Sequence, residues 1–355
     1  MTALWISNET PDRAGQGGQR RQFFQIKALV DAGVEVTVVS LAGPQDDSSI
    51  RAVAPVHRVR LRRRFAGRSR GVQRQLGRLQ STVDAIIVVH SESWATFRPY
   101  LAPDPPSLWV DLQNVNSCWQ WTLGHHDQAR QQAALEADLW DHADQVSVCT
   151  RQEAERLLHG PPALLTPGSR HPEILRNGVD ASEWRIEPIP ADQPVLKLFG
   201  GWTWRPNHDG LEWFLEQVWP HVRSATTARC VIAGTGAEQA GLVDGVEVVG
   251  RLDRLDKFAA DAWAIAAPIR HGVGGPVKIA EALASGIPTV TTVDGDVHPG
   301  LHLASDDPKE WIAALTRLLT PPSSAPMTAP ERRAVADRLS WAAVTEPLLG
   351  WLRQV

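Results

Sequence analysis

Tyrosine, methionine, cysteine and lysine are all scarce in this chain of 355 residues, with one, two, three and five copies. The three cysteines, Cys118, Cys149 and Cys230, are odd in number, lie far apart and show no metal-binding spacing. Such thiols are typical of a reducing compartment. The start of the chain also lacks the basic and apolar segments of a secretory leader, so we expect a cytoplasmic protein.

Long apolar runs and a strong net charge are also missing. No run reaches the length that crosses a bilayer, and the net charge of −4 gives no general attraction to nucleic acid. A hydrophobic content of 43% with 21% charged residues is that of a soluble globular protein. The length allows two domains, each with its own core.

Short apolar runs alternate with helical patterns along the whole chain, which predicts α/β architecture with parallel sheets. A proline-rich break at residues 187–194 is the best linker candidate. We therefore predict two Rossmann-like, doubly wound domains whose strand ends face a shared cleft. The expected boundaries are an N-terminal domain at 1–186, a C-terminal domain at 187–330 and a closing helix at 331–355 that returns toward the first domain.

Residues 267–292 form the most informative segment: a strand end, a glycine loop, a short helix and another strand. The loop contains Gly272, Gly274 and Gly275, which allow the backbone to approach a ligand closely. Pro276 suits the first turn of a helix. The free amides and the positive dipole end of that helix would point into the loop, where phosphate binds well.

Three charged residues flank this loop. Arg270 precedes it, whereas Lys278 and Glu281 lie three apart and share one helix face. A cation for phosphate and a carboxylate for ribose hydroxyls together suggest a nucleotide sugar. Glycine loops are common in α/β proteins, but lysine is rare here, with 31 arginines against five lysines. Lys278 is therefore expected to be a compact phosphate ligand that arginine would not replace well.

The segment resembles the donor-binding region of family 4 glycosyltransferases, the large retaining group with the GT-B fold. The resemblance extends over nearly the whole chain, and the order of its parts is more specific than any single part. It rests on eight segments: 4–7, 15–21, 25–39, 110–117, 174–180, 199–214, 267–292 and 340–341.

The resemblance implies a retaining glycosyltransferase that moves a hexose-type sugar from a nucleoside diphosphate such as UDP to an acceptor hydroxyl, without a further cofactor. It implies that His90 approaches the donor sugar and that Arg251 and Leu252 lie near the nucleotide base. Arg270 and Lys278 would hold the diphosphate as it leaves, and Glu281 would bind ribose. Gly17 and Gly18 would approach the diphosphate or the acceptor.

Asp111 and Asn114 resemble an Asp-x-x-Asn segment in one branch of the family, and we expect them to contact the acceptor, to order the cleft or to cap a helix. The chain departs from the family at two places. Val273 replaces the first of two glutamates in the donor loop. Trp202, Trp204 and Arg205 stand where many members carry a basic pair, so Trp202 and Arg205 are expected to line the donor site.

No metal site is expected. Asp294 and Asp296 resemble the Asp-x-Asp of a different glycosyltransferase architecture but fit a turn better. His125 and His126 are adjacent on a predicted helix and cannot converge on one ion. The stretch 58–78 has nine arginines and no acid. It is either a solvated face or a patch that docks on an anionic membrane, and it lacks the aromatics of a nucleic-acid site.

Two other functions remain open. An epimerase of the same fold would consume nucleotide sugar without an acceptor. A non-catalytic partner subunit would explain Val273 and the reduced basic pair. A phosphorylase would need a pyridoxal lysine, for which only Lys278 is placed. The acceptor, whether lipid-linked, polysaccharide or a small natural product, cannot be read from these residues. An acceptor at a lipid surface would place the enzyme at the inner face of the membrane.

Overall fold

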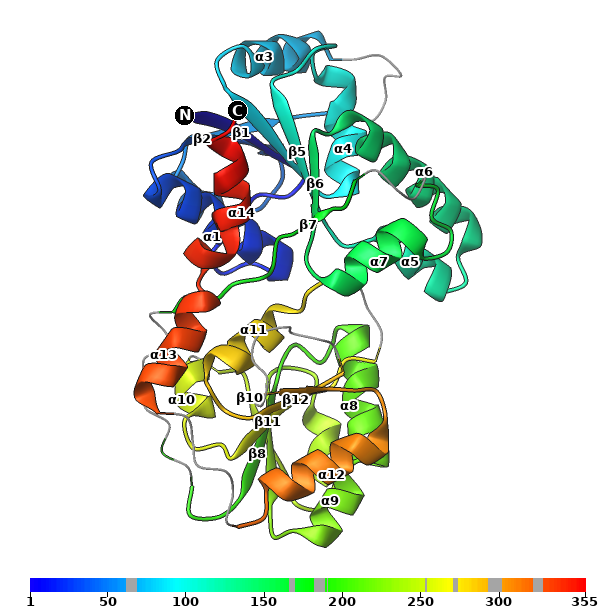
Figure 1. Ribbon diagram of the computed structural model, residues 1–355, viewed down its shortest axis with the longest axis vertical. Coiled ribbons are helices and arrows are strands. Elements are labelled where there is room, and N and C mark those ends of the chain that lie inside the picture. The colour runs from blue at the N-terminus through cyan, green and yellow to red at the C-terminus, as the bar shows by residue number, and fades with distance from the viewer. Residues whose placement is uncertain are drawn as a thin grey trace. The chain divides into compact units, whose positions relative to one another are not determined.

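The computed structural model describes residues 1–61, 69–165, 170–181, 189, 191–252, 254–270, 274–292, 302–321 and 328–355. Contacts between Cα atoms divide the chain into two compact units. The first contains Met1–Asn177, Val273–Gly275 and Trp341–Val355, and the second contains Gly178–Gly272 and Pro276–Ser340. Figure 1 labels helices and strands of both units.

The first unit contains a parallel sheet of seven strands in the order β3-β2-β1-β4-β5-β6-β7. Its strands run in chain order as β1 (Thr2–Ser7), β2 (Glu35–Leu41), β3 (Val56–Val59), β4 (Ala85–Val89), β5 (Ser107–Gln113), β6 (Gln145–Val148) and β7 (Glu173–Ile174). The central strands are buried on both faces and therefore consist of continuous apolar runs, such as the Ala-Ile-Ile-Val-Val of β4.

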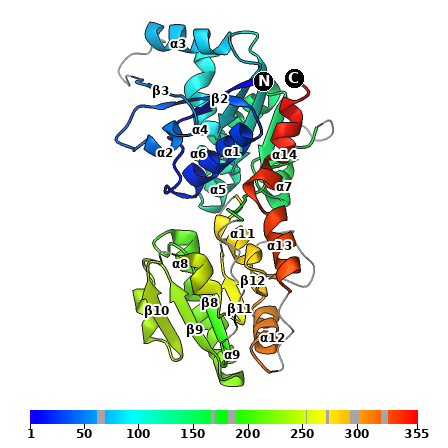
Figure 2. The ribbon, with the colours of Figure 1, turned by 90° about the vertical axis from the view of Figure 1, so that its left-hand side faces the viewer.

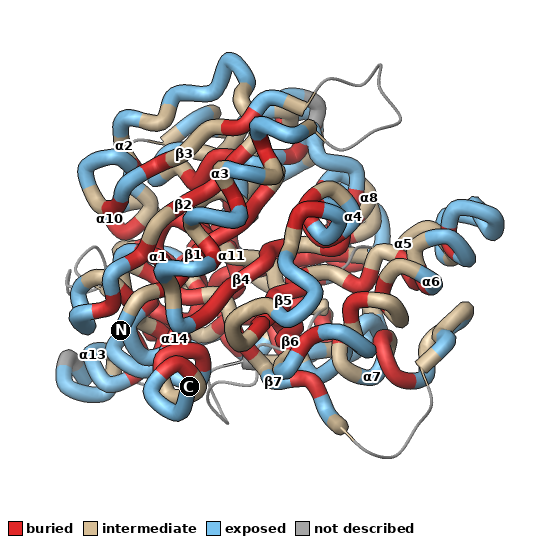
Figure 3. The backbone as a smooth tube through the Cα atoms, turned by 90° about the horizontal axis from the view of Figure 1, so that it is seen from above, coloured by how far each residue is buried: buried red, intermediate tan, exposed pale blue. Residues whose placement is uncertain are grey.

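Helices cover both faces of this sheet. They are α1 (Gly17–Asp31), α2 (Ser48–Arg51), α3 (Arg70–Gln80), α4 (Ser91–Phe97), α5 (Asn116–Thr122), α6 (His126–His142), α7 (Arg151–His159) and α14 (Trp341–Leu352), with a 3₁₀ turn at Arg98–Tyr100. Successive residues of β1 enter opposite cores: Trp5 packs with α1 and α14, whereas Leu4 and Ile6 pack with α3, α4 and α6. Seen from above, the buried strands are enclosed by helices that are exposed on their outer sides (Figure 3).

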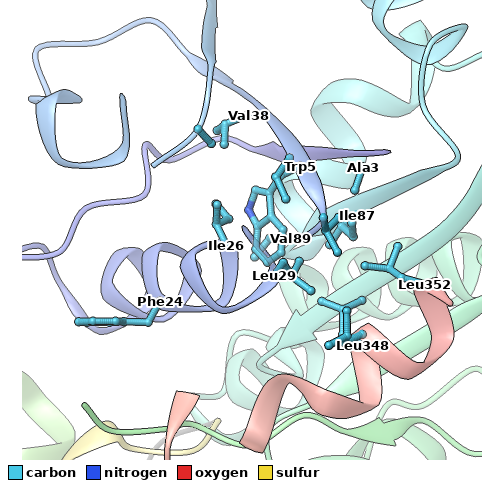
Figure 4. Close-up of a cluster of buried hydrophobic side chains, with 14 of the residues drawn as sticks. Ala3, Trp5, Phe24, Ile26, Leu29, Val38, Ile87, Val89, Leu348 and Leu352 are labelled. Atoms are coloured by element: carbon cyan, nitrogen blue, oxygen red, sulfur yellow. The ribbon is translucent and has the colours of Figure 1, made fainter. Parts of the chain in front are cut away.

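The last helix of the chain belongs to the first unit. Leu348 and Leu352 of α14 reach the same core as Leu29 of α1 and Ile87 of β4, as Figure 4 shows. At the start of α14, the ring of Trp341 stacks on Phe24 with a centroid separation of 5.5 Å and an interplanar angle of 4°. The C-terminal segment thus completes the core beside β1, although more than 300 residues separate the two in sequence.

The second unit has a parallel sheet of six strands in the order β10-β9-β8-β11-β12-β13. Its strands are β8 (Val195–Phe199), β9 (Arg229–Ala233), β10 (Val246–Gly250), β11 (Ala264–Ala267), β12 (Thr289–Thr291) and β13 (His302–Ala304). Its helices are α8 (Arg205–Gln217), α9 (Trp219–Ala225), α10 (Leu255–Ala259), α11 (Val277–Ala284), α12 (Pro308–Leu318) and α13 (Ala329–Arg338), with a 3₁₀ turn at Glu238–Leu242.

One face of the second sheet carries α8, α9 and α12, whose core includes Phe214, Trp219 and Trp311. The other face carries α10 and α11, and α13 packs against α11 through Val335 and Ala336. This proximity of α11 and α13 is visible in Figure 2. Both units are therefore doubly wound, and the predicted fold class is confirmed.

In each sheet the strand order reverses at one point. The reversal lies between β1 and β4 in the first sheet and between β8 and β11 in the second. The loops that follow these strands leave toward opposite faces, so a ligand crevice forms at this point in doubly wound sheets. Gly17 and Gly18 follow β1, and Gly274 and Gly275 follow β11, so both pairs come after strands at the reversal points.

The limits of the units differ from the predicted domain limits. The first unit ends at Asn177 rather than at 186, and the chain returns to it at Trp341, so α13 belongs to the second unit. Residues 182–188 and 190, which include part of the proposed linker, are outside the described part of the chain. Within the described part, no helix combines the length and the apolar character needed to cross a membrane.

Candidate functional site

The buried ammonium of Lys278 is the centre of the candidate site in the second unit. Lys278 lies in the first turn of α11 and is 9% exposed. Its Nζ donates a hydrogen bond to Oδ1 of Asn207, in the first turn of α8, at 2.7 Å. The same Nζ lies 5.1 Å from the ring centroid of Trp202, which allows a cation–π interaction.

The loop after β8 closes around this lysine. The Asn207 amide nitrogen donates to the Gly201 carbonyl at 2.9 Å, so a single side chain joins the loop to Lys278. A Cβ atom on Gly200 would lie 3.8 Å from the Lys278 Nζ. The loop after β8, the first turn of α8 and the first turn of α11 therefore meet at one point, where the strand order reverses.

This ammonium has little to stabilise its charge. Among the residues that the structure describes, no carboxylate forms an ion pair with Lys278, and burial lowers its pKa to about 7. A buried cation without a counter-ion is costly, and an anionic ligand would remove that cost. The helix dipole of α11 also favours an anionic ligand here, because the positive end of the helix lies at this turn. The arrangement is suited to binding a phosphate group.

The other basic candidates are engaged elsewhere. The guanidinium of Arg270 lies 5.0 Å from the ring of Trp213 and donates to the Asp306 carbonyl at 3.2 Å. The Arg205 side chain is 81% exposed and lies 3.5 Å from the Asp209 carboxylate, one turn along α8. Of the predicted phosphate-binding cations, only Lys278 is thus held at the point where the loops meet.

The expectation that Trp202 lines a ligand surface is corrected by its burial. Its side chain is 0% exposed, because the ring belongs to the core beside α8 and its Nε1 donates to the Ala233 carbonyl at 2.9 Å. Trp202 therefore supports the Lys278 ammonium from within the core. Its neighbour Trp204 is 48% exposed.

The remaining donor candidates of the second unit lie around the same sheet edge. Glu281 is half-buried on α11, one turn after Lys278. Arg251 is exposed directly after β10, and Leu252 packs against the core on the α10 side. Gly272 and Val273 are outside the described residues.

In the first unit, the loops after β1, β4 and β5 bring three polar side chains around Gly18. A Cβ atom on Gly18 would lie 3.5 Å from Nε2 of His90, 3.7 Å from Oε1 of Gln113 and 3.8 Å from Oε2 of Glu9. Gly18 lies in the first turn of α1, Glu9 and His90 follow β1 and β4, and Gln113 is the last residue of β5. The structure thus brings Gly18 and His90 together, as expected for one site, and adds Glu9 and Gln113.

Asp111 does not face a ligand, which corrects the expectation that it contacts an acceptor. It is 0% exposed and pairs with Arg21 of α1, whose NH2 atom lies 3.1 Å from Oδ2. Ser147 donates to its Oδ1 at 2.9 Å. Burial opposes the charge of Arg21, but the Asp111 carboxylate outweighs this effect, so the pKa of Arg21 is raised. Asp111 is therefore a structural anchor for α1.

A capping role is also absent from Asp111 and Asn114. The amides at the start of α5 are bound by two buried carboxylates: Glu153 accepts from Val115 at 2.7 Å, and Glu136 accepts from Ser117 at 3.0 Å. Asn114 is half-buried, and its Oδ1 would overlap a Cβ atom on Gly274, which has a φ of +80°. Gly274 and Gly275 group with the first unit, where the Asn177 amide donates to the Gly275 carbonyl.

Two of the four metal candidates named from the sequence lie within the described residues. Asp294 and Asp296 are outside the described residues, His125 contacts Gln120, and the His126 ring packs on Trp121. Within the described ranges, one cluster of possible ligands occurs, at His208, Asp209 and Glu212 along one turn of α8. Two of its three members are exposed, and such acidic clusters are common without an ion.

The arginine-rich stretch is described only in part, because residues 62–68 are outside the described ranges. Arg58 donates to the carbonyls of Gln45 and Gly43, so it is not part of an open patch. Arg70, Arg74 and Arg78 recur every four residues along α3 and are exposed, while Val72 and Leu76 of the same helix are buried.

Comparisons with known proteins agree with this architecture. Residues 17–165 match the family described as glycosyl transferase 4-like domain, and residues 193–321 match glycosyl transferases group 1. The chain belongs to the group 1, family 4-type glycosyltransferases. The first region contains Gly18, His90 and Gln113, and the second contains Lys278 and Asn207.

The individual relatives share little sequence identity with this family member. The chain is 26% identical over 283 residues to a glycogen synthase of Mycobacterium tuberculosis, which covers 71% of this chain and 63% of the relative. The match thus spans less than two thirds of that protein's length. Sucrose-phosphate synthase of Thermosynechococcus elongatus superposes with a TM-score of 0.73 at 17% identity, covering 99% of this chain and 98% of that one.

A second solved structure is HepE of Anabaena, which was determined in complex with UDP and glucose. It gives a TM-score of 0.68 at 14% identity and covers all of both chains. At these identities the two structures establish the GT-B fold of this glycosyltransferase family member and nothing more specific.

Sequence reasoning on this family member missed Asn207, Glu9 and Gln113. Asn207 sits in an Arg-Pro-Asn-His-Asp segment that reads only as a helix start. Glu9 follows β1 at the point of strand reversal, and Gln113 ends β5, which lies one strand beyond that point. Their positions at the carboxyl ends of strands are the signal that would have identified them.

Proposed function

We propose that the chain is a retaining glycosyltransferase that moves a hexose-type sugar from a nucleoside diphosphate to an acceptor hydroxyl. The single observation that carries the proposal is the buried Lys278 ammonium, held by Asn207 beside the glycine loop after β8. Membership of the glycosyltransferase family supports the same reaction. The relatives include proteins whose names specify synthesis of glycogen or sucrose phosphate and one bound to UDP, which favours UDP as the nucleotide.

In the proposed reaction Lys278 binds the diphosphate of the donor. The bond between C1 of the sugar and the phosphate oxygen breaks, and negative charge grows on the leaving diphosphate. A preorganised ammonium in a water-poor position stabilises that charge more than bulk water does. Lys278 therefore contributes most in the transition state, and the first turn of α11 adds its helix dipole.

The acceptor step completes the proposal. The acceptor oxygen forms a bond to C1 on the face that the diphosphate leaves, and its proton passes to the departing phosphate oxygen. This route retains the configuration at C1 and needs no separate protein base. Glu281, half-buried one turn from Lys278, would accept hydrogen bonds from the ribose hydroxyls. We propose that no metal takes part.

The test has three measurements. Calorimetry with UDP and GDP identifies the nucleotide, and a panel of nucleoside diphosphate sugars with mass detection identifies the donor and product. The anomeric configuration of the product is then read by NMR, with and without EDTA. Lys278→Gln is expected to lower both nucleotide affinity and turnover, whereas Lys257→Gln, on the exposed side of α10, is the matched control and should change neither.

Three outcomes would contradict the proposal. Nucleotide binding without product across a broad acceptor panel would favour a non-catalytic subunit. Conversion of a nucleotide sugar to its epimer in the absence of acceptor would favour an epimerase. A product of inverted configuration would overturn the retaining mechanism while leaving glycosyl transfer in place.

A further inference from the structure

A groove of about 470 Å³ lies in the second unit, between α9 and the turn that precedes β10. Its lining residues are Trp219, Pro220, Arg223, Ser224, Val243 and Asp244. The turn leads into the amino end of β10, whereas the loop around Lys278 follows the carboxyl end of β8, and the strands between them run parallel. The groove therefore lies at the opposite end of the sheet from the proposed donor site and is not part of it.

Two side chains tie the walls of this groove together. Trp219 is buried, and its Nε1 donates to the Asp244 carbonyl at 2.9 Å, which fixes the turn against α9. Arg223 donates from Nε to the Asp244 carboxylate at 3.0 Å and from NH1 to the Ala228 carbonyl at 3.3 Å. Gly245 leaves room for this arginine, because a Cβ atom there would lie 2.6 Å from its Nε. The shape of the groove is thus set by the fold.

Leu242 stands at the edge of the groove and projects into solvent. It is 86% exposed, more than any other large hydrophobic residue in the described part of the chain. It ends a 3₁₀ turn and directly precedes Val243, which lines the groove. A single exposed leucine is ordinary on a protein surface. Here, however, a projecting apolar side chain and an apolar hollow lie next to each other on one surface.

This pairing of projection and hollow points to a second copy of the chain as the partner. In a two-fold dimer the same patch of each copy meets the other, so a projection must lie beside the hollow that it fills. The charges at the rim are self-complementary as well, because Arg223 is partly exposed and the Asp244 carboxylate is mostly exposed. Each can face the opposite charge of a second copy, whereas a strongly acidic or basic partner would meet charges that cancel.

The groove also adjoins an open edge of the sheet. Among the described strands, β10 has a neighbour on one side, β9, and Figure 2 shows β10 at the edge of the sheet. Val249 of this strand is exposed. Native proteins commonly cover or blunt such edges, because an open edge can pair with other chains. A second copy docked on the turn before β10 would cover the start of this edge.

We propose that the chain forms a two-fold homodimer through the second unit, in which Leu242 of each copy inserts into the groove between α9 and β10 of the other. The contact lies at the end of the sheet away from Lys278, so it leaves the candidate nucleotide site uncovered. The proposal goes beyond glycosyl transfer and does not depend on it.

Sedimentation equilibrium over a wide range of protein concentration tests the dimer. The wild type is expected to show a reversible monomer–dimer equilibrium with twice the chain mass at the upper end. Leu242→Asp should raise the Kd of the dimer about a hundredfold, because two leucines lose their burial and each contributes about tenfold. Leu164→Asp, at an exposed leucine of the first unit, is the matched control and should dimerise as the wild type does. Thermal unfolding checks that both variants remain folded.

A cross-link tests the reciprocal geometry. The three native cysteines are buried, so engineered thiols are the ones that react. A tagged Leu242→Cys chain is mixed with an untagged Ser224→Cys chain, which places one thiol on the projection and one in the groove. Mild oxidation should link the two chains, and mass spectrometry should locate the disulfide between positions 242 and 224. A Leu164→Cys chain mixed with either variant should not be linked.

Three results would overturn the proposal. A wild type that stays monomeric over the whole concentration range would show that the groove has no such partner. Dimerisation of Leu242→Asp as tight as that of the wild type would place the interface on another surface. A dimer that Leu242→Asp weakens but that gives no link between positions 242 and 224 would show that the leucine packs outside the groove.

Discussion

The ammonium of Lys278 and the side-chain amide of Asn207 are joined at 2.7 Å, although 71 residues separate them in sequence. The other end of the same amide holds the Gly201 carbonyl at 2.9 Å. Asn207 is thus the link between the β8 loop and α11. Because its oxygen is neutral, it orients the ammonium and leaves the positive charge available for an anion.

This relationship predicts that two substitutions of Asn207 differ in their effect on stability but share the same effect on binding. Asn207→Ala leaves the buried Lys278 without its acceptor and is expected to lower the free energy of unfolding by about 1–3 kcal/mol. Asn207→Asp pairs the ammonium with a carboxylate and is expected to be less destabilising. Both should weaken UDP at least tenfold, the second because the carboxylate competes with phosphate.

Urea unfolding and calorimetry with UDP check this pair of substitutions. Glu212→Gln, on the exposed side of the same helix, is the control and should leave UDP affinity unchanged. Wild-type UDP affinity in Asn207→Asp would show that Asn207 does not act through Lys278.

The second prediction concerns pH. Burial lowers the pKa of Lys278 to about 7, and a bound diphosphate is expected to raise it. Above pH 7 Lys278 is increasingly neutral in the free protein, so the protein takes up a proton when UDP binds. UDP affinity therefore falls by up to about tenfold per pH unit. Calorimetry at pH 8 in buffers of different ionisation enthalpy measures this uptake. Lys278→Gln should lose it, and an unchanged uptake in that variant would contradict the assignment.

The lowered pKa of Lys278 also determines how the free energy of unfolding changes with pH. The folded-state pKa of Lys278 is below its ordinary value of 10.5, so between pH 7 and about 10.5 the unfolded chain binds more protons than the folded one. The Lys278 contribution to the free energy of unfolding therefore rises with pH across this window. The difference between wild type and Lys278→Gln, followed by urea unfolding, should show that rise.

Much of the fold could be predicted from the sequence because most strands are buried on both faces. Apolar runs such as 84–89 and 107–112 stand out for that reason, and the corresponding strands begin or end within one residue of them. Two strands, β3 and β13, are not marked by an apolar run of this kind. They are three or four residues long and contain histidine or arginine, so their pattern does not differ from that of a loop.

Only two kinds of feature in the candidate site could be predicted from the sequence. Glycine loops and Lys278 stand out because few residue types can replace them. By contrast, the pairing of Asp111 with Arg21 joins residues 90 positions apart, and no local pattern reports it. The burial of Trp202 likewise depends on how α8 packs on the sheet. Contacts that depend on tertiary packing were therefore the ones that sequence reasoning misassigned.

The buried Asp111–Arg21 pair gives the third prediction. Asp111→Ala leaves Arg21 charged and without its carboxylate, although Asn177 and the Leu175 carbonyl still accept from it at 2.8 and 2.6 Å. Loss of one partner of a buried pair costs about 3–5 kcal/mol. The double variant Asp111→Leu with Arg21→Met should recover most of this loss in urea unfolding. Full stability of Asp111→Ala would contradict the anchoring role.

Glu136 gives a pH prediction for the first unit. Burial raises its pKa to about 7, although Ser117 donates to it from both its amide and its hydroxyl. Between pH 4.5 and 7 the folded protein holds a proton that the unfolded chain has lost, so stability falls as pH rises through this window. Glu136→Gln should flatten this part of the stability curve. Parallel curves for the two proteins would show that Glu136 ionises normally.

The arginine stripe on α3 gives the last prediction. Arg70, Arg74 and Arg78 are exposed at a spacing of four, so they lie on one side of the helix while Val72 and Leu76 face the core. Each basic residue near an anionic surface contributes about 1 kcal/mol to binding. The protein is therefore expected to sediment with vesicles that contain phosphatidylglycerol, and raised salt should release it.

Replacement of these three arginines by glutamine should abolish sedimentation. The control replaces Arg130 of α6, Arg333 of α13 and Arg353 just after α14, which are all exposed, and changes the net charge equally. If both triple variants lose binding to the same extent, the total charge of the protein rather than the α3 stripe drives the interaction. If neither wild type nor control sediments with anionic vesicles, the stripe is an ordinary solvated helix face.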